Sequence, residues 1–94
     1  MNLSMSKMRH IQFTRSNLQG AGIEGCQLTN VSFDPCNLME AEFYHTSLKG
    51  IDLSNSEISG IRITNLANSE LRGASVSSLQ ALELARILGI EIKD

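Results

Sequence analysis

The feature that most constrains this chain is an apolar residue at every fifth position from Leu3 to Ile63, thirteen in an unbroken series. The position two before each apolar centre carries no charged residue, and the position directly before it is polar in every repeat except at Gly22. A period of five fits neither the 3.6-residue helix nor a long alternating strand. The chain must therefore turn after every two or three extended residues, as a solenoid does.

Glycine is concentrated in one phase of this repeat. Five of the seven glycines fall two residues after an apolar centre: Gly20, Gly25, Gly50, Gly60 and Gly73. A tight turn with a positive φ angle favours glycine because glycine has no Cβ. We therefore expect the turn of each repeat at this phase.

Length and composition limit the chain to a small protein. Its 94 residues and formal net charge of −2 are consistent with one compact domain. The N-terminal segment lacks the apolar core of a signal peptide, and no apolar run is long enough to span a bilayer, so we expect a cytoplasmic protein with both cysteines reduced. The mixed-sign charge gives no reason to expect direct nucleic-acid binding or a membrane partner.

The repeats resemble the pentapeptide-repeat family, whose pattern is A(D/N)LXX with a central Leu or Phe. The cleaner copies are Ser16-Asn17-Leu18, Cys36-Asn37-Leu38, Ile51-Asp52-Leu53 and Thr64-Asn65-Leu66. This resemblance implies an all-β solenoid, a right-handed quadrilateral β-helix with about twenty residues per coil and coils stacked about 4.8 Å apart. We expect about four coils in residues 1–76.

A coil of this length predicts which side chains stack inside. The expected core ladders are Phe13, Phe33 and Leu53, and Leu3, Ile23, Phe43 and Ile63. Cys26 and Cys36 are half a coil apart, and we expect no disulfide because their separation would exceed the reach of the bond. After Ile63 the next good centres are Leu66, Leu71 and Val76, so the repeat is expected to be cut short by two residues near 63–65.

Residues 77–94 change to a helical pattern followed by a short alternating segment. Ser77 and Gln80 form a capping-box pattern, and Gly89 marks the end of the helix. We expect an apolar face either to close the last coil or to pair two copies of the chain, and a short strand over 90–92. The face comprises Leu79, Leu82, Ala85 and either Leu88 or Ile87. The segment resembles the closing part of bacterial quinolone-resistance type pentapeptide-repeat proteins, in which a C-terminal helix pairs two monomers. That resemblance implies a homodimer.

No catalytic or metal-binding motif is present. The sequence has no P-loop, dinucleotide fingerprint, zinc-ligand spacing or nucleophile elbow. His10 and His45 fall in the exposed turn phase nearly two coils apart, and Glu40 and Glu42 lie near one corner with nothing to enclose them. We therefore expect no enzyme activity, no cofactor and no metal.

Two functions remain, and both use the surface. The first is a protein-interaction or scaffold module with an unknown protein partner. The second, implied by the family, is a DNA mimic that binds DNA gyrase or topoisomerase IV. A mimic about 19 Å long would need about eleven negative charges, but residues 1–66 carry six acidic and five basic side chains. The candidate acidic surface comprises Glu24, Asp34, Glu40, Glu42, Asp52 and Glu57. The resistance proteins have about twice as many coils, so a third reading is a piece of a longer solenoid.

Overall fold

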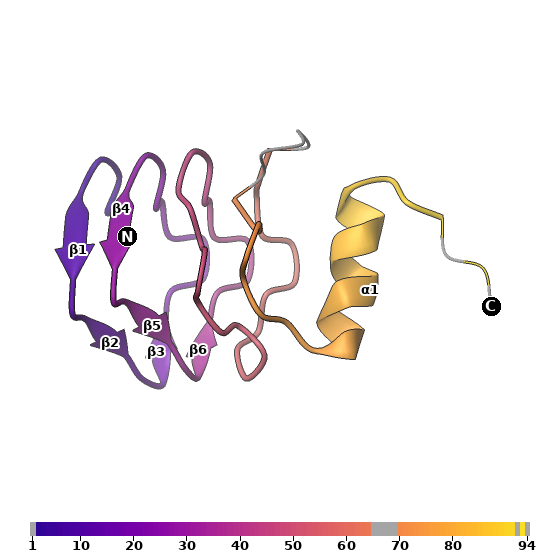
Figure 1. The fold of residues 1–94 in the computed structure, drawn as a ribbon, viewed down its shortest axis with the longest axis horizontal. Helices are drawn as coiled ribbons and strands as arrows, with labels where there is room; N and C mark the ends of the chain where they lie inside the picture. Colours follow the sequence, from indigo (N-terminus) through magenta and orange to yellow (C-terminus); the bar gives the residue numbers. More distant parts are fainter. Residues whose placement is uncertain (1, 65–69, 92, 94) are drawn as a thin grey trace.

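The computed structural model describes residues 2–64, 70–91 and 93, and they form stacked coils followed by a helix (Figure 1). Strand β1 (Lys7–Arg9) pairs in parallel with β4 (Gln27–Thr29), β2 (Gln12–Phe13) with β5 (Ser32–Phe33), and β3 (Ser16–Asn17) with β6 (Cys36–Asn37). Every pair is offset by twenty residues, as in Phe13 beside Phe33. The five-residue repeat therefore folds as coils of twenty residues.

The stacking continues beyond these strands. Parallel bridges join Gly22 to Glu42, Glu42 to Arg62 and Asn37 to Glu57, again at steps of twenty. Main-chain hydrogen bonds accompany them, such as Ile23 N–H to the Glu42 carbonyl at 2.8 Å. Each coil thus uses the next one as the partner for its backbone polar groups, which a short strand of two or three residues could not satisfy alone.

The turn phase adopts the left-handed conformation, and glycine is not its only occupant. Gly20, Gly25, Gly50 and Gly60 have φ between 67 and 79°, and six other residues of this phase have φ between 51 and 64°: Met5, His10, Arg15, Asn30, Glu40 and His45. Hydrogen bonds such as Ala21 N–H to the Leu18 carbonyl close four-residue turns with the left-handed residue third. This is the geometry of a type II turn.

The polar phase before each centre also has a structural role. The Oδ1 atoms of Asn2, Asn17, Asn37 and Asp52 each accept a hydrogen bond from the backbone N–H two residues later, at 2.9–3.1 Å. Short Asn and Asp side chains are suited to this local bond because it closes a turn without any long-range contact. The Asp/Asn preference of the repeat follows from this geometry.

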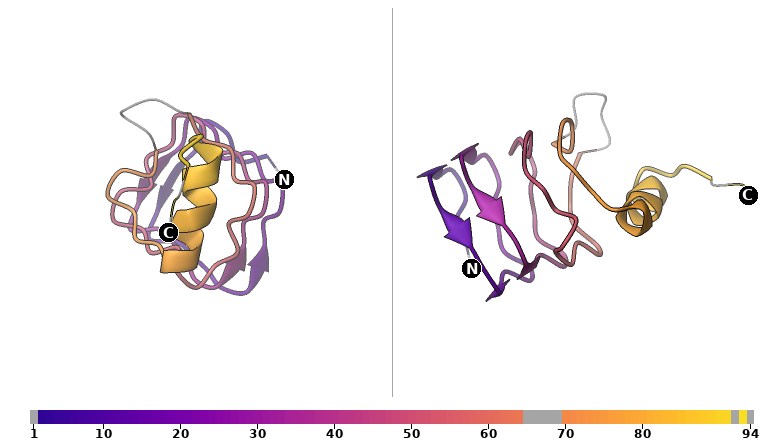
Figure 2. Two further views of the ribbon diagram at one scale, coloured as in Figure 1. Left: turned by 90° about the vertical axis from the view of Figure 1, so that its right-hand side faces the viewer. Right: turned by 60° about the horizontal axis from the view of Figure 1, so that its bottom comes forward.

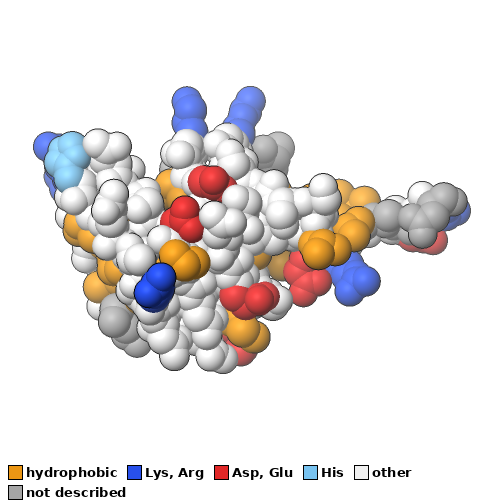
Figure 3. All heavy atoms as spheres, turned by 90° about the horizontal axis from the view of Figure 1, so that it is seen from below, with side chains coloured by type: hydrophobic (Ala, Val, Ile, Leu, Met, Phe, Trp, Pro, Cys, Tyr) orange, Lys and Arg blue, Asp and Glu red, His pale blue; other side chains and the backbone are white. Residues whose placement is uncertain are grey.

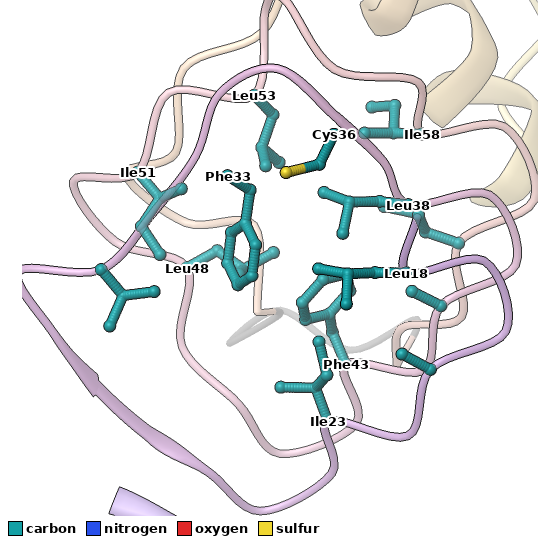
Figure 4. Packing of buried hydrophobic residues seen from close by; sticks show 14 of the residues in the cluster. Leu18, Ile23, Phe33, Cys36, Leu38, Phe43, Leu48, Ile51, Leu53 and Ile58 are labelled. Carbon is teal, nitrogen blue, oxygen red and sulfur yellow. The ribbon is translucent and has the colours of Figure 1, made fainter. Parts of the chain in front are cut away.

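The centres of the repeats fill the interior (Figure 4). Phe33, Leu53, Ile23, Phe43 and Ile63 are all buried, and Phe13, in the first coil, is only half-buried. The rings of Phe13 and Phe33 stack with centroids 5.2 Å apart, and Phe43 meets Phe33 edge-on at 6.0 Å. Aromatic stacking thus links successive coils along the axis.

Small side chains two residues before the apolar centres form hydrogen bonds with buried backbone groups. Thr46 Oγ1 accepts from the Cys26 N–H at 3.0 Å and donates to the Ile23 carbonyl, and Ser56 makes the equivalent pair of bonds with Cys36 and Phe33. The thiols of Cys26 and Cys36 donate to carbonyls one coil earlier, each at 3.0 Å. Both cysteines are free and buried, in agreement with the expected absence of a disulfide.

The break in the repeat is an insertion, so the expected shortening by two residues is wrong. Asp52 bridges to Ser75, a step of 23 residues, and Leu53 N–H bonds the Ser75 carbonyl at 2.8 Å. Adding three residues and removing two give the same phase in a period of five, so sequence phase alone could not separate them. Leu71 and Val76 pack against the core as expected centres, whereas Leu66 lies outside the described residues.

Helix α1 (Ser78–Ile87) lies across the end of the coil stack (Figure 2). Ser77 and Gln80 form the expected capping box. At the other end the Ile90 N–H bonds the Ala85 carbonyl and the Gly89 N–H bonds the Arg86 carbonyl, which is a Schellman motif. The expected strand over 90–92 is therefore wrong for Ile90 and Glu91, because the helix cap uses the Ile90 N–H; Ile92 lies outside the described residues.

Candidate interaction surfaces

The six acidic residues of the candidate surface lie on the outside, on different sides of the coil stack. Glu42 is half-buried and the other five are exposed. The bridges place Glu42, Asp52 and Glu57 on three separate stacks, beside Gly22, Ser75 and Asn37. On the face in Figure 3 the acidic side chains are scattered among uncharged ones and do not form a continuous strip. The structure does not bring the six acids together.

The net charge of the coils changes along the axis of the stack. Residues 1–20 carry Lys7, Arg9 and Arg15 and no acidic side chain, giving a net charge of +3. Residues 21–60 carry the six acids and only Lys49, giving a net charge of −5. The first coil is therefore basic and the coils after it are acidic, a polarity that the total charge of −2 conceals.

Asp52 has a second role in this acidic region. The hydroxyl and the N–H of Ser54 both donate to its carboxylate, and these bonds hold the pKa of Asp52 below its ordinary value. Asp52 is therefore ionised at neutral pH and contributes a fixed negative charge to its side of the stack.

The outer face of α1 is apolar. Leu79, Leu82 and Leu88 are 79, 43 and 41 % exposed, and Ile90 beyond the helix is 55 % exposed. Of the two roles expected for this face, closing the last coil does not apply to Leu79, Leu82 and Leu88, because the helix turns another face inward; pairing of two copies stays a prediction. Leu84 is buried there and Ile87 packs on the core, while Ala85 is half-buried.

Gln80 fixes this orientation. Its Nε2 donates to the carbonyls of Leu53 and Ser56 at 2.6 and 2.7 Å, and its Oε1 accepts from the Ser77 N–H at 2.8 Å.

A shallow hollow of about 480 Å³ runs between α1 and residues 54–59, with Leu79 and Leu82 on its helical side. A second, polar hollow of about 730 Å³ lies beside His10, Asn30, Lys49 and Asp52.

The described residues contain no arrangement typical of catalysis. They include no group of three or more His, Cys, Asp or Glu side chains that could hold a metal ion. His10 Nδ1 lies 3.0 Å from Asn30 Nδ2 on the surface, and the His45 side chain is also exposed. Among the described helices, none is long and apolar enough to cross a membrane.

Glu70 is the one buried carboxylate in the described part of the chain, and sequence reasoning missed it. Its Oε2 accepts from the His45 N–H at 2.8 Å, and its Oε1 accepts from the Thr64 N–H at 3.0 Å and from the Thr64 hydroxyl at 3.1 Å. Burial raises the pKa of Glu70, but these bonds and one from its own N–H outweigh burial, so the pKa lies below the ordinary value. Every acceptor position is used for folding contacts, so Glu70 has a structural role.

Comparisons with known proteins agree with this architecture. Residues 2–34 match the family model described as pentapeptide repeats, with eight copies. Seventeen solved chains match significantly, among them a trypsin-treated variant of QnrB1, described as a plasmid-mediated fluoroquinolone resistance protein. That alignment has 23 % identity and a TM-score of 0.56 and covers 98 % of this chain. It covers 45 % of the QnrB1 chain, so this chain spans less than half of that length.

A second trypsin-treated variant of QnrB1 also matches at 23 % identity, covering 99 % of this chain and 68 % of the other, but with a TM-score of 0.28 it supports no conclusion. A search of curated protein sequences found no significant match. The family model and the first structural match together imply a right-handed β-helix.

Proposed function

We propose that this chain, whose residues 2–34 match the pentapeptide-repeat family model, acts as a non-catalytic protein-interaction module of the cytoplasm and pairs with a second copy through α1. The observation that carries the proposal is the row of leucines left exposed on the outer face of the helix. An apolar group of this kind at one end of a small protein is typical of a protein–protein contact. The described surface otherwise offers polar sides and shallow hollows, with no enclosed space for a substrate.

Pairing through α1 predicts that charges placed on its exposed leucines abolish the dimer. Leu79→Glu combined with Leu82→Glu places two charges in the interface, where each would be desolvated without a partner. We expect sedimentation velocity to show a dimer for the unaltered chain and a folded monomer for the double variant. Gln27→Glu combined with Ser47→Glu adds the same charge to an exposed side of the coils and should leave the dimer intact. A double-leucine variant that stays dimeric would place the interface elsewhere.

A second candidate function is protection of DNA gyrase or topoisomerase IV by mimicry of duplex DNA. Two observations favour it: the structural similarity to QnrB1, described as a fluoroquinolone resistance protein, and the net charge of −5 over residues 21–60. The acidic side chains would take the place of DNA phosphates in the enzyme's DNA-binding groove.

A gyrase supercoiling assay with a fluoroquinolone tests the mimic. If the mimic is correct, the protein restores supercoiling in the presence of the drug, and the triple variant Glu24→Gln, Asp34→Asn, Asp52→Asn restores much less. The amide at residue 52 keeps the oxygen that accepts from Ser54, so the turn is retained. No protection at a large excess of protein would exclude this function and leave the interaction module unaffected.

A further inference from the structure

The main-chain hydrogen bonding between coils is interrupted inside the stack. Strands β4 and β5 pair with β1 and β2 on one side, with a wider space before the third coil in Figure 1. Residues 27–34 and 47–54 are all described, and no main-chain hydrogen bond or bridge joins the two segments. One repeat later the same coils are joined: Leu38 N–H donates to the Glu57 carbonyl at 2.8 Å, and Glu57 N–H donates to the Cys36 carbonyl at 3.0 Å. The opening is therefore local, with coils on both sides of it.

Four main-chain groups along this opening are free to bond. The Ser32 N–H donates to the Ile11 carbonyl of the first coil at 3.0 Å. Neighbouring residues of a parallel strand bond to opposite sides, so the Phe33 N–H and the Val31 carbonyl are directed at the third coil. The N–H and the carbonyl of Asp52 face them, because the residues flanking Asp52 bond to the fourth coil. No described residue forms a hydrogen bond with any of these four groups, so two donors and two acceptors face one another across the opening.

The polar hollow of about 730 Å³ lies along this opening. Its walls include Val31, Ser32 and Asp34 from the second coil and Ile51 and Asp52 from the third. The hollow opens to the outside, so a segment of another molecule can reach the main-chain groups at its walls. A parallel strand of three residues placed there would bond to both walls, in the same register that joins the other coils.

The charges of the hollow restrict the central residue of such a strand. That residue would stand between Ser32 and Asp52 and would direct its side chain outward, as they do. At the ordinary strand spacing of about 4.8 Å it would be a direct neighbour of the Asp52 carboxylate, and Asp34 lines the same hollow. A basic side chain would be attracted there and an acidic one repelled.

The interior restricts the two flanking residues. They would point inward, next to core residues such as Phe33 and Leu53. Both of these side chains are fully buried, so the core is already filled at this level and accepts only small apolar side chains. No Lys or Arg of this chain stands between two alanines or glycines, which disfavours a second copy as the occupant.

We propose that the opening between the second and third coils binds an extended segment of a partner protein, in which a basic residue stands between two small apolar residues. The segment adds as a parallel strand between β5 and residues 51–53. This inference rests on the proposed function as an interaction module and identifies one of its surfaces.

Amide hydrogen exchange measured by NMR tests the opening itself. In the free chain the amides of Phe33 and Asp52 should exchange about tenfold or more faster than those of Leu38 and Glu57. The latter two hold the same phases one repeat later and are bonded between the same two coils. Equal protection of both pairs would mean that the opening is closed and would overturn the proposal. Protection that rises with protein concentration would assign the opening to a second copy and would overturn it as well.

A short blocked peptide of sequence Ser-Ala-Arg-Ala-Ser is the probe for the partner segment. We expect the full chain to bind it in fluorescence anisotropy, with added protection of the Phe33 and Asp52 amides. Methylation of the backbone nitrogen of the arginine removes the donor to the Val31 carbonyl and should weaken binding about tenfold. A peptide with glutamate in place of arginine should bind about fivefold more weakly.

Two charge variants of the chain separate this site from the rest of the surface. Asp52→Asn keeps the oxygen that accepts from the Ser54 N–H, and it should reduce the preference for arginine over glutamate with little change in melting temperature. Glu57→Gln removes one charge from the next side, where the coils are joined, and should leave the preference unchanged. Equal binding of the two peptides by the unaltered chain would contradict the proposal. Sedimentation velocity reports pairing through α1 separately, so failure of this inference is distinguishable from failure of the proposed function.

Discussion

Phe33→Asp is expected to abolish folding. Phe33 is fully buried and contacts two other rings, that of Phe13 in the coil before it and that of Phe43 in the coil after it. Removing a buried aromatic side chain alone costs about 3–5 kcal/mol, and the carboxylate adds the penalty of an unpaired buried charge. The total approaches or exceeds the 5–15 kcal/mol that stabilises a typical small protein.

Circular dichroism and thermal melting check this expectation. Gln27→Asp adds the same charge to the exposed phase of β4, one repeat earlier, and should melt within a few degrees of the unaltered chain. Phe33→Leu keeps the position apolar and should fold with reduced stability. A soluble Phe33→Asp variant that melts cooperatively near the unaltered melting temperature would mean that the inward phase of the repeat has been assigned incorrectly.

The regular coils could be predicted because three kinds of sequence signal agree there. The apolar centres, the Asn or Asp before them and the glycines after them each specify the same turn, and the structure shows a separate contact for each. Left-handed residues such as Met5, Arg15 and Glu40 carry no such signal in their identity. Their conformation is imposed by hydrogen bonds to the neighbouring coil, so periodicity predicts it and residue propensity does not.

The irregular part could be predicted only in outline, for two physical reasons. The sequence gives the position of a residue within its five-residue repeat but not the number of residues in the coil. An insertion of three residues and a deletion of two therefore give the same pattern. Apolar residues also occur on most sides of α1, so the spacing that predicted the face with Leu79 and Leu82 did not identify the face that packs on the coils. The polar residue Gln80 decides it, through bonds to carbonyls 24 and 27 residues away, and such a pairing has no local sequence signal.

The candidate surfaces were also only partly predictable. Five of the six candidate acids are exposed and Glu42 is half-buried. The sequence does not reveal that Leu79, Leu82 and Leu88 lie on the outer face of α1, away from the last coil. The apolar outer face of α1 is therefore a feature that only the structure reveals.

Glu70→Ala is expected to cause the largest loss of stability of any single change to a charged residue in the described part of the chain. In the regular coils the N–H of Met5 and that of Gly25 each donate to a carbonyl 19 residues later. The equivalent carbonyl for His45 would be that of Thr64, but the inserted residues follow it, and the His45 N–H donates to Glu70 Oε2. The Glu70 carboxylate thus replaces the missing main-chain acceptor of the His45 N–H and also accepts hydrogen bonds from the N–H and hydroxyl of Thr64.

Removing this carboxylate leaves the His45 and Thr64 N–H groups without an acceptor, at about 1–3 kcal/mol each. We expect the melting temperature to fall by about 10 °C or more. Glu70→Gln should lose less, because its amide oxygen can still accept from one of the two. Glu83→Ala is the control, since Glu83 makes only a 3.9 Å contact with the exposed Arg86, and its effect should be within about 0.5 kcal/mol.

The pH dependence of the unfolding free energy distinguishes the contribution of the Glu70 charge from that of its packing. Because the pKa of Glu70 is lowered on folding from an ordinary value of 4.5, its ionisation stabilises the fold fully above that value, and the contribution is lost as the pH falls through the folded-state pKa. The difference in unfolding free energy between the unaltered chain and Glu70→Gln should therefore be constant near neutral pH and shrink below about pH 4.5. Urea titrations at a series of pH values measure it. A difference that persists unchanged in acid would show that Glu70 acts through packing and not through its negative charge.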